Sequence, residues 1–380
     1  MYLRSIFVLA SSWLLATVDA GCKNYGTGDS NCPADLPCCS LDGKCGSGAF
    51  YCLAGSCDAA NSFSTSSCYS APSCQTGKDT FGNILALSPK SKYIGDPNLA
   101  AWVSEPTSQA EIRDGYLNLI LNSTGGESKV SSTRWIKYGA VTARVRSASS
   151  GKGVVSQFVI KDQNGNEIDF NWVGTNPRHV QANYNYKKQL TSIPAVNSPD
   201  LGDTTQAFHD YTISWDQDSI TWAVDGMSFR TLNRLDTESI GDNDYKFPST
   251  ESQIVFRVWD GGSSSDPQTQ KWAGSPTNFA DGASYTMSVY SVTITCDPSN
   301  GSSNYTLPPD VAAYEKAHNI TSDNFSLTAD PDNARREGNS GGSSNVSIIP
   351  GDSSASRLAS FSTIPSLFAL SVAIAASHLY

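Results

Sequence analysis

The stretch between Phe81 and Thr295 consists of short runs of β-branched and aromatic residues separated by turn residues. Gly, Asn, Asp or Pro punctuates these runs, as in strands joined by tight turns, and no long amphipathic helical pattern interrupts them. Asp225-Gly226 is typical of a two-residue hairpin turn. The pattern predicts an all-β fold, an antiparallel β-sandwich. The expected strands are 116–121, 141–146, 154–160, 180–186, 211–215, 220–224, 254–259 and 285–295.

Nine of the ten cysteines precede this stretch, and the tenth follows it. Such clustering indicates a small module held together by disulfides in an oxidising compartment. Because nine is odd, we expect one of them to pair with Cys296 and so tie the module to the end of the β-domain; a free thiol is the alternative. The cysteines are Cys22, Cys32, Cys38, Cys39, Cys45, Cys52, Cys57, Cys68, Cys74 and Cys296.

The segment from Asn166 to Trp172 places two acids and an amide at alternate positions. Side chains alternate across a strand, so Glu167, Asp169 and Asn171 share one face, which is difficult to explain as core. Retaining glycoside hydrolysis uses one carboxylate as nucleophile and a second group as proton donor and then base. Glu167 can be the nucleophile and Asp169 can assist it. Asn171 cannot give or take a proton, so the same strand predicts a sugar-processing site and weakened catalysis.

Composition narrows the range of ligands. The formal net charge is −10 and only 16% of residues are charged, which argues against nucleic acid as a partner. The chain has four histidines, scattered along it, and its cysteines are needed for disulfides, so no metal site or cofactor is expected. Abundant Ser, Thr, Asn, Gly and aromatic residues suit a secreted β-protein with a polar, uncharged ligand.

Both ends of the chain resemble processing signals. Residues 1–20 have the pattern of a cleaved signal peptide, with a signal anchor as the alternative. The window Gly351, Asp352, Ser353, Ser354, followed by a polar spacer and an apolar tail, predicts attachment of a GPI anchor within 351–380, with a tail anchor as the alternative. The expected location is the cell surface, with the membrane reached only through that anchor.

Six N-glycosylation sequons fit the secretory route, and four of them lie between Asn300 and Asn324. We therefore expect residues 298–350 to be a glycosylated polar linker in which only 310–318 looks weakly helical. The sequons are Asn122, Asn300, Asn304, Asn319, Asn324 and Asn345.

Several motifs, in order, resemble one family closely. They are Ser131-Ser-Thr-Arg134 with Tyr138-Gly139, the strand from Asn166 to Gly174, Gln181-Ala-Asn183-Tyr184, His209 to Trp215, Thr221 to Gly226, Trp259 to Gly262, and Lys271 to Gly274. Together they resemble the fungal Crh-type cell-wall transglycosylases of glycoside hydrolase family 16, in the form with an N-terminal chitin-binding-like Cys-rich module. The resemblance covers about Cys22 to Cys296 and implies a module at 21–74 and a concanavalin-like jelly-roll β-sandwich at 75–297.

The resemblance also implies roles. Members of this family cleave one wall polysaccharide, keep the sugar as an enzyme ester and pass it to another glycan, typically from chitin to β-glucan. Glu167 matches the nucleophile, Asp169 the assisting acid and Asn171 the acid/base position, where the family has Glu. Asn166 departs as well, because the family usually has Asp. The residues expected to bind substrate are Arg134, Tyr138, Gln181, Asn183, Tyr184, Trp259 and Trp272.

The tryptophans divide into two groups. Trp215 and Trp222 alternate with apolar residues and are expected in the core, whereas Trp259 and Trp272 precede glycines and are expected to line the cleft.

The Cys-rich module has hevein-like spacing and keeps Ser40 and Tyr51. Asp42 and Lys44, however, stand where aromatic residues would stack on N-acetylglucosamine. Chitin binding by the module and a purely structural role both remain open.

Two functions follow from these residues. The first is a wall-glycan transglycosylase whose activity is reduced by Asn171. The alternative is a catalytically impaired carbohydrate-binding protein of the cell wall on the same fold. A purely structural surface protein fits less well, because the whole cleft signature is present.

Overall fold

The structure is a computed structural model of the 380-residue chain and describes residues 22, 32–83, 86–124, 126–190, 193–239, 244–274, 276–300 and 305–320. The expected signal peptide, the GPI window, and Asn304, Asn324 and Asn345 lie outside these residues. In the part of the chain that is described, no helix combines the length and the apolarity needed to cross a bilayer.

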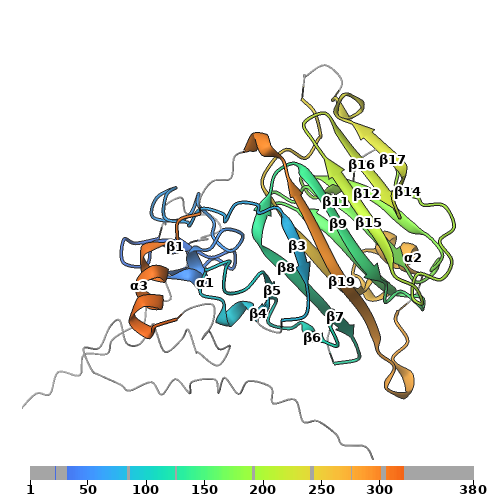
Figure 1. The fold of residues 1–380 in the computed structure, drawn as a ribbon, viewed down its shortest axis with the longest axis horizontal. Coiled ribbons are helices and arrows are strands. Elements are labelled where there is room, and N and C mark those ends of the chain that lie inside the picture. Colours follow the sequence, from blue (N-terminus) through green and yellow to red (C-terminus); the bar gives the residue numbers. More distant parts are fainter. Residues whose placement is uncertain are drawn as a thin grey trace, which may run out of the picture. The chain divides into compact units, whose positions relative to one another are not determined.

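Two β-sheets form most of the described chain (Figure 1). The nine-stranded sheet runs in the order β13 (Gln189–Leu190), β12 (Val180–Tyr186), β11 (Glu167–Val173), β10 (Val154–Lys161), β18 (Ser252–Asp260), β8 (Glu127–Ile136), β5 (Trp102–Ser104), β4 (Leu87–Pro89), and β14 (Val196–Asn197) pairs with β12. The eight-stranded sheet runs in the order β17 (Met227–Asn233), β16 (Ser219–Val224), β15 (His209–Trp215), β9 (Gly139–Arg146), β19 (Tyr285–Cys296), β7 (Tyr116–Leu121), β6 (Gln109–Arg113), and β3 (Gly77–Thr80) pairs with β19.

The pairing is antiparallel throughout both sheets except between β4 and β5. The predicted β-sandwich is therefore confirmed, and all eight expected strands are present with ends shifted by at most two residues. Asp225 and Gly226 have φ values of 50° and 80°, as a two-residue hairpin turn between β16 and β17 requires.

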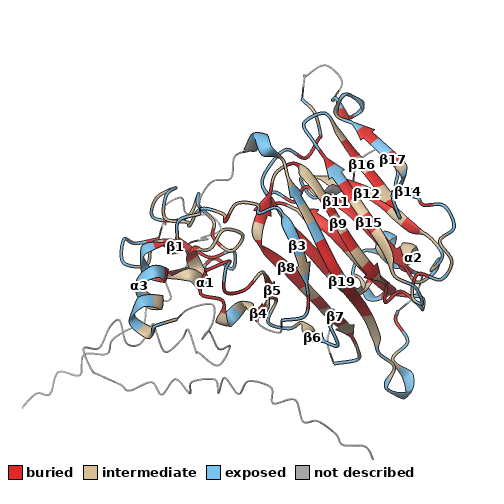
Figure 2. Cartoon of the chain, in the orientation of Figure 1, coloured by how far each residue is buried: buried red, intermediate tan, exposed pale blue. Residues whose placement is uncertain are grey.

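The apolar face of each sheet packs against that of the other (Figure 2). Phe170 and Trp172 of β11 meet Tyr211 of β15 edge to face, with ring centroids 5.5 and 4.6 Å apart. Trp215 and Trp222 are buried, as expected. Burying each large side chain of this kind contributes roughly 1.5–3 kcal/mol, so this core determines which residues of each strand point outward.

Short helices complete the fold. The α-helices are α1 (Ala49–Cys52), α2 (Pro267–Ala273) and α3 (Pro309–His318), and the 3₁₀ helices are η2 (Lys90–Lys92), η3 (Arg234–Thr237), η4 (Gly261–Ser263), η5 (Ala280–Gly282) and η6 (Pro298–Asn300). Because α2 begins with Pro267 after the N-cap Asp266, whose carboxylate accepts from the backbone N–H groups of Gln268 and Thr269, it has both features of a stable helix start.

The Cys-rich module is a small, disulfide-bonded unit containing α1, β1 (Cys38–Cys39) and β2 (Cys45–Gly46). Its four internal bridges are Cys22–Cys39, Cys32–Cys45, Cys38–Cys52 and Cys57–Cys68. The fifth bridge joins Cys74 to Cys296 at the end of β19, so the predicted link from the module to the end of the β-domain is confirmed.

Helix α3 brings part of the expected linker back to the module. Val311 is buried, and its Cγ2 lies 3.3 Å from the position that a Cβ on Gly95 would take. Tyr69 donates a hydrogen bond to Asp310. Residues 309–318 therefore form the helix that the sequence indicated weakly, and they pack on folded protein instead of acting as a bare linker.

We predict that replacing Cys74 and Cys296 together with Ser lowers the free energy of unfolding by roughly 4–5 kcal/mol, because this bridge closes the longest loop, with a sequence separation of 222. Urea unfolding of the purified protein measures the change. The control is the pair Cys57 and Cys68, separated by only 11 residues, whose removal should cost about 2–3 kcal/mol less. Equal losses for both pairs would contradict the prediction.

Candidate active site

Strand β11 presents the three polar residues on the outer face of the nine-stranded sheet, because Ile168, Phe170 and Trp172 point into the core. The structure brings Glu167, Asp169 and Asn171 together as the sequence predicted. Asp169 and Asn171 are 1% and 5% exposed, whereas the side chain of Glu167 is 23% exposed. Glu167 is therefore the most accessible of the three to a ligand.

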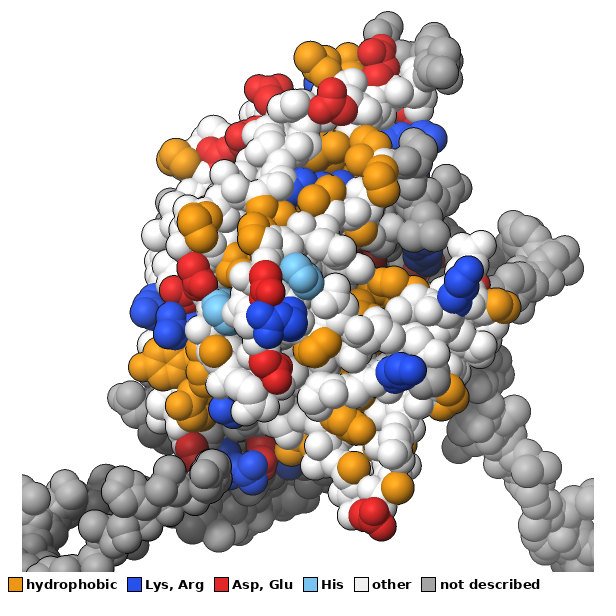
Figure 3. Space-filling model, turned by 90° about the vertical axis from the view of Figure 1, so that its right-hand side faces the viewer, with side chains coloured by type: hydrophobic (Ala, Val, Ile, Leu, Met, Phe, Trp, Pro, Cys, Tyr) orange, Lys and Arg blue, Asp and Glu red, His pale blue; other side chains and the backbone are white. Residues whose placement is uncertain are grey.

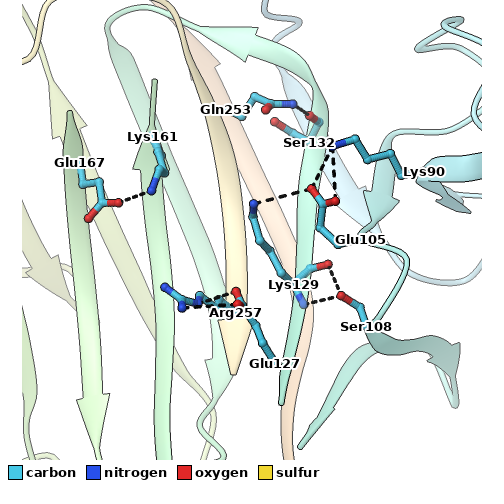
Figure 4. A network of polar contacts seen from close by, with 10 residues as sticks. All are labelled: Lys90, Glu105, Ser108, Glu127, Lys129, Ser132, Lys161, Glu167, Gln253 and Arg257. Atoms are coloured by element: carbon cyan, nitrogen blue, oxygen red, sulfur yellow. Dashed lines mark hydrogen bonds and ion pairs between the residues drawn. The ribbon is translucent and has the colours of Figure 1, made fainter. Parts of the chain in front are cut away.

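The carboxylate of Glu167 is held by two donors from neighbouring strands. Lys161 Nζ of β10 lies 2.5 Å from Oε1 (Figure 4), and Asn185 Nδ2 of β12 donates to Oε2 at 3.0 Å. Both residues face Glu167 directly in the strand register. Charge-assisted hydrogen bonds of this kind fix the position of a carboxylate.

Asp169 occupies the most buried polar position of the site. Burial and, second, the negative charge of Glu167 raise its pKa to about 8, while the hydrogen bond from Asn171 acts in the opposite direction. The carboxyl is therefore protonated at neutral pH. It can hold a hydrogen bond to a neighbour without adding a second negative charge to the strand.

The backbone beneath Asp169 is tied to the opposite sheet. Trp222 Nε1 of β16 donates to the carbonyl oxygen of Asp169 at 3.1 Å. Arg230 of β17 stacks on Trp222 with its guanidinium carbon 4.7 Å from the ring centroid, and it donates to the carbonyl of Ala182 on β12. These contacts fix two adjacent site strands from the core side.

Asn171 uses both ends of its amide. Its Nδ2 donates to Asp169, and its Oδ1 accepts from Gln157 Nε2 at 2.5 Å. Gln157 Oε1 in turn accepts from Trp259 Nε1 at 3.1 Å and from Arg257 at 3.3 Å. Since an amide has no titratable proton, this chain of hydrogen bonds positions Asn171 but cannot transfer a proton from it.

Aromatic residues and amides surround this centre. Trp272 of α2 donates from Nε1 to Gln181 Oε1 at 2.8 Å, and Gln181 lies opposite Asn171 in the register of β11 and β12. Gln181 and Asn183 are half-buried on the outer face, as are Trp259 and Trp272. Such a surface offers aromatic rings to sugar faces and amides to sugar hydroxyls.

Ion pairs extend the polar face across the sheet (Figure 4). Arg257 of β18 lies 2.5 Å from Glu127 of β8, and Glu105 lies 3.2 Å from Lys90 and 3.6 Å from Lys129. On the side of the molecule shown in Figure 3, acidic and basic side chains are likewise interspersed with apolar ones. This distribution suits an uncharged ligand better than a polyanion.

Three residues predicted to bind substrate lie elsewhere. Tyr184 points into the core and is 1% exposed, because it has the opposite parity to Gln181 and Asn183. Tyr138 is 7% exposed and packs edge to face on Trp215. The guanidinium group of the remaining residue, Arg134, donates hydrogen bonds to the carbonyl oxygen of Ser73 and to Oδ1 of Asn98. We correct the expectation that these three line the site.

Asn166 and two histidines of the β-domain make structural contacts. Asn166 caps the hairpin between β10 and β11, with its backbone N–H and its amide both donating to Asp162. The ring of His209 lies 2.7 Å from Asp225, and that of His179 lies 2.8 Å from the carbonyl of Ser198. Neither histidine bonds to the three β11 residues.

Sequence reasoning missed Lys161, Gln157 and Asn185, which hold the three β11 residues in place. The Asn164-Gly165 dipeptide marks a turn between β10 and β11, but a two-residue turn there would place Ile168 opposite Lys161. The observed pairing of Lys161 with Glu167 has one residue more in the loop, so the sequence alone did not give this register. Asn185 and Gln157 need the register of further strand pairs.

Comparison with known proteins places this geometry in a family. Residues 98–275 match glycosyl hydrolases family 16. The chain is 36% identical over 309 residues to Crh-like protein 2 of Aspergillus fumigatus, covering 77% of this chain and 68% of that protein. It is also 36% identical over 247 residues to Crh-like protein 3 of Botryotinia fuckeliana, covering 65% of this chain and 54% of that protein.

Among solved structures, the chain resembles a Crh5 transglycosylase in complex with NAG, with a TM-score of 0.50 and 24% identity. The match covers 60% of this chain and 86% of that one, and it shows a shared fold. The β-sandwich, the outer-face acids of β11 and the sequence matches agree, and the chain therefore belongs to the Crh-like proteins and carries a glycosyl hydrolase family 16 domain.

Proposed function

We propose that this chain is a cell-wall polysaccharide glycosidase or transglycosylase, of the type that links chitin to β-glucan, with activity reduced by Asn171. The observation that carries the proposal is the group of Glu167 and Asp169 on one outer face, with Glu167 partly exposed and held by Lys161 and Asn185. A carboxylate fixed in this way is suited to attack an anomeric carbon.

The proposed reaction has two displacements. In the first, Glu167 forms a bond to the anomeric carbon of the donor while the glycosidic C–O bond breaks, and the departing oxygen takes up a proton. In the second, a hydroxyl of the acceptor glycan attacks the ester, loses its proton and releases Glu167. Both proton transfers need an acid/base group, and the residue at that position, Asn171, supplies none.

Asp169 does not simply replace that group. It is protonated at neutral pH, but it is 1% exposed and already bonded to Asn171. In the proposed mechanism it holds Asn171 in position and limits charge on the strand beside Glu167. Trp259, Trp272, Gln181 and Asn183 would bind the sugar rings and hydroxyls.

A second candidate function is carbohydrate binding without turnover. It is favoured by the amide of Asn171, whose two ends are both engaged by Gln157 and Asp169, as in a residue that shapes a binding surface. In this reading the same face recognises a wall glycan but leaves it intact.

The proposed location is the cell surface, by secretion and GPI attachment at Gly351–Ser354. The disulfides of the described residues fit an oxidising compartment. For the Cys-rich module the proposal is weak chitin binding or a purely structural role, because Ser40 is buried, Tyr51 is half-buried, and Asp42 and Lys44 are exposed in place of aromatic residues.

We predict that Asn171→Glu increases transfer between oligosaccharides by roughly 10² or more, because it restores a titratable group at the acid/base position. The assay incubates the ectodomain with chito-oligosaccharides and labelled glucan oligosaccharides and quantifies hybrid products. Asn171→Gln is the matched control, since it lengthens the side chain without adding a carboxyl group, and it should give no gain.

An activated aryl glycoside separates the two steps. Its leaving group departs without a proton, so the unmodified protein should become labelled at Glu167 and the ester should accumulate. If the unmodified protein transfers oligosaccharides as fast as Asn171→Glu, another group supplies the proton. If neither protein transfers them while both still bind oligosaccharide, the binding function is favoured.

We also predict that the free energy of unfolding decreases as the pH rises, and that the substitution Asp169→Asn makes this decrease smaller. The folded carboxyl has a pKa of about 8, whereas the ordinary value of an aspartate is 3.8, so between these pH values the folded protein keeps a proton that the unfolded chain loses. The free energy of unfolding should therefore decrease from about pH 4 to pH 8 in the unmodified protein, and less so in Asp169→Asn.

Urea unfolding at several pH values tests this prediction. The control is Asp200→Asn, because the hydrogen bond from Arg178 lowers the pKa of this exposed carboxyl. That variant should be slightly less stable near neutral pH, and the difference should vanish in acid. Parallel pH profiles for Asp169→Asn and the unmodified protein would show that Asp169 is charged in the folded state.

A further inference from the structure

A row of outer-face residues leads from Glu167 towards the Cys-rich module. In the strand register, Glu167 of β11 faces Lys161 of β10, Lys161 faces Gln253 of β18, and Gln253 faces Trp135 of β8. Neighbouring strands lie about 4.8 Å apart, so β8 is about 14 Å from β11, the length of roughly three sugar rings. Figure 4 shows Glu167, Lys161 and Gln253 on these successive strands.

Beside this row, the outer side of the sheet is closed by buried side chains. Val159 and Val255 face each other on the outer side of β10 and β18, between Asp169 and Ser131, and they are 5% and 4% exposed. Their strand neighbours Phe158 and Phe256 belong to the core. The groups that a ligand can reach here are therefore the amides and charged groups of the row, which can bind sugar hydroxyls.

The module lies directly beyond Trp135. The backbone N–H of Trp135 donates to the carbonyl of Pro72 at 2.7 Å, and Trp135 forms a β-bridge with Ser73. A Cβ added to Gly55 would lie 3.0 Å from the Trp135 ring and 3.2 Å from Gln253 Oε1. The loop Leu53–Ser56 therefore contacts the last two residues of the row.

A pocket of about 90 Å³ lies at this junction. Its walls come from the loop Leu53–Ser56 on the module side and from Lys129, Ser131 and Gln253 on the sheet side. Lys90 and Glu105, which form an ion pair at 3.2 Å, also border it. The pocket thus combines both folded units and continues the outer face on which Glu167 lies.

We propose that the loop Leu53–Ser56, which rests on the buried Trp135, forms a distal glycan subsite with Gln253, so that a polysaccharide bound at Glu167 extends across β10, β18 and β8 onto the module. This inference rests on the proposed function. In this proposal the module contributes the loop Leu53–Ser56 to the glycan-binding surface of the β-domain. That role does not depend on aromatic residues at positions 42 and 44, where the chain has Asp42 and Lys44. The ligand class is an uncharged β-linked polysaccharide.

The test measures binding of oligosaccharides of increasing length to the full ectodomain by calorimetry, with a chito-oligosaccharide and a laminari-oligosaccharide series. Affinity should keep rising beyond the length that spans β11 to β8. In the variant Ala54→Trp the larger side chain fills the pocket. Binding of the longest oligosaccharides should then weaken about tenfold, the size of effect expected when one buried contact region is lost. Binding of disaccharides, which do not reach the pocket, should not change. Thr65→Trp is the matched control, because Thr65 is exposed on the same module and does not line the pocket.

Hydrogen exchange of the unmodified protein gives a readout independent of folding of the variant. Long oligosaccharides should protect the backbone amides of residues 53–56, and disaccharides should not. Long chains that bind equally to Ala54→Trp and the unmodified protein, or that leave residues 53–56 unprotected, would overturn the subsite. If no oligosaccharide of any length binds or is processed, the proposed function fails together with it.

Discussion

The packing of β11 into the core determines the chemistry of the outer face. Ile168, Phe170 and Trp172 fill the space between the sheets, and alternation then places Glu167, Asp169 and Asn171 outside. A shift of one residue would exchange the two sets and bury three polar groups, so the apolar residues specify the register strongly. The bond from Trp222 to the carbonyl of Asp169 adds a polar contact from the opposite sheet at the same point.

This dependence explains which features the sequence could predict. Strand runs, the Asp225-Gly226 turn and the Cys296 bridge follow from local pattern and parity of the cysteine count, and each is confirmed. Tyr184 was wrongly predicted to bind substrate because that prediction followed the motif resemblance. Alternation along the strand already placed Tyr184 on the face opposite to Gln181 and Asn183, and the residue is buried. Lys161, Gln157 and Asn185 depend on pairing between strands, which a single sequence shows only where a tight turn fixes the register.

An amide at position 171 affects the energetics of the strand. Asp169 is buried and its pKa is raised by burial and by Glu167, so a carboxylate at position 171 would add charge in a poorly solvated place and repel Glu167. The amide instead donates to Asp169 and accepts from Gln157, and a buried polar group costs little when its hydrogen bonds are made. At this position the amide therefore costs the folded state less than a further charged group would.

The Cys-rich module is held in a fixed position by several contacts with the β-domain. A module on a flexible linker samples many positions, and its contribution to binding depends on linker length. Here the Cys74–Cys296 bridge, the β-bridge between Ser73 and Trp135, and the contact of Gly55 with Trp135 restrict the module to one edge of the sheet. A binding surface that is already ordered loses less conformational entropy when a ligand arrives, so even weak contacts in the loop Leu53–Ser56 can add affinity for long chains.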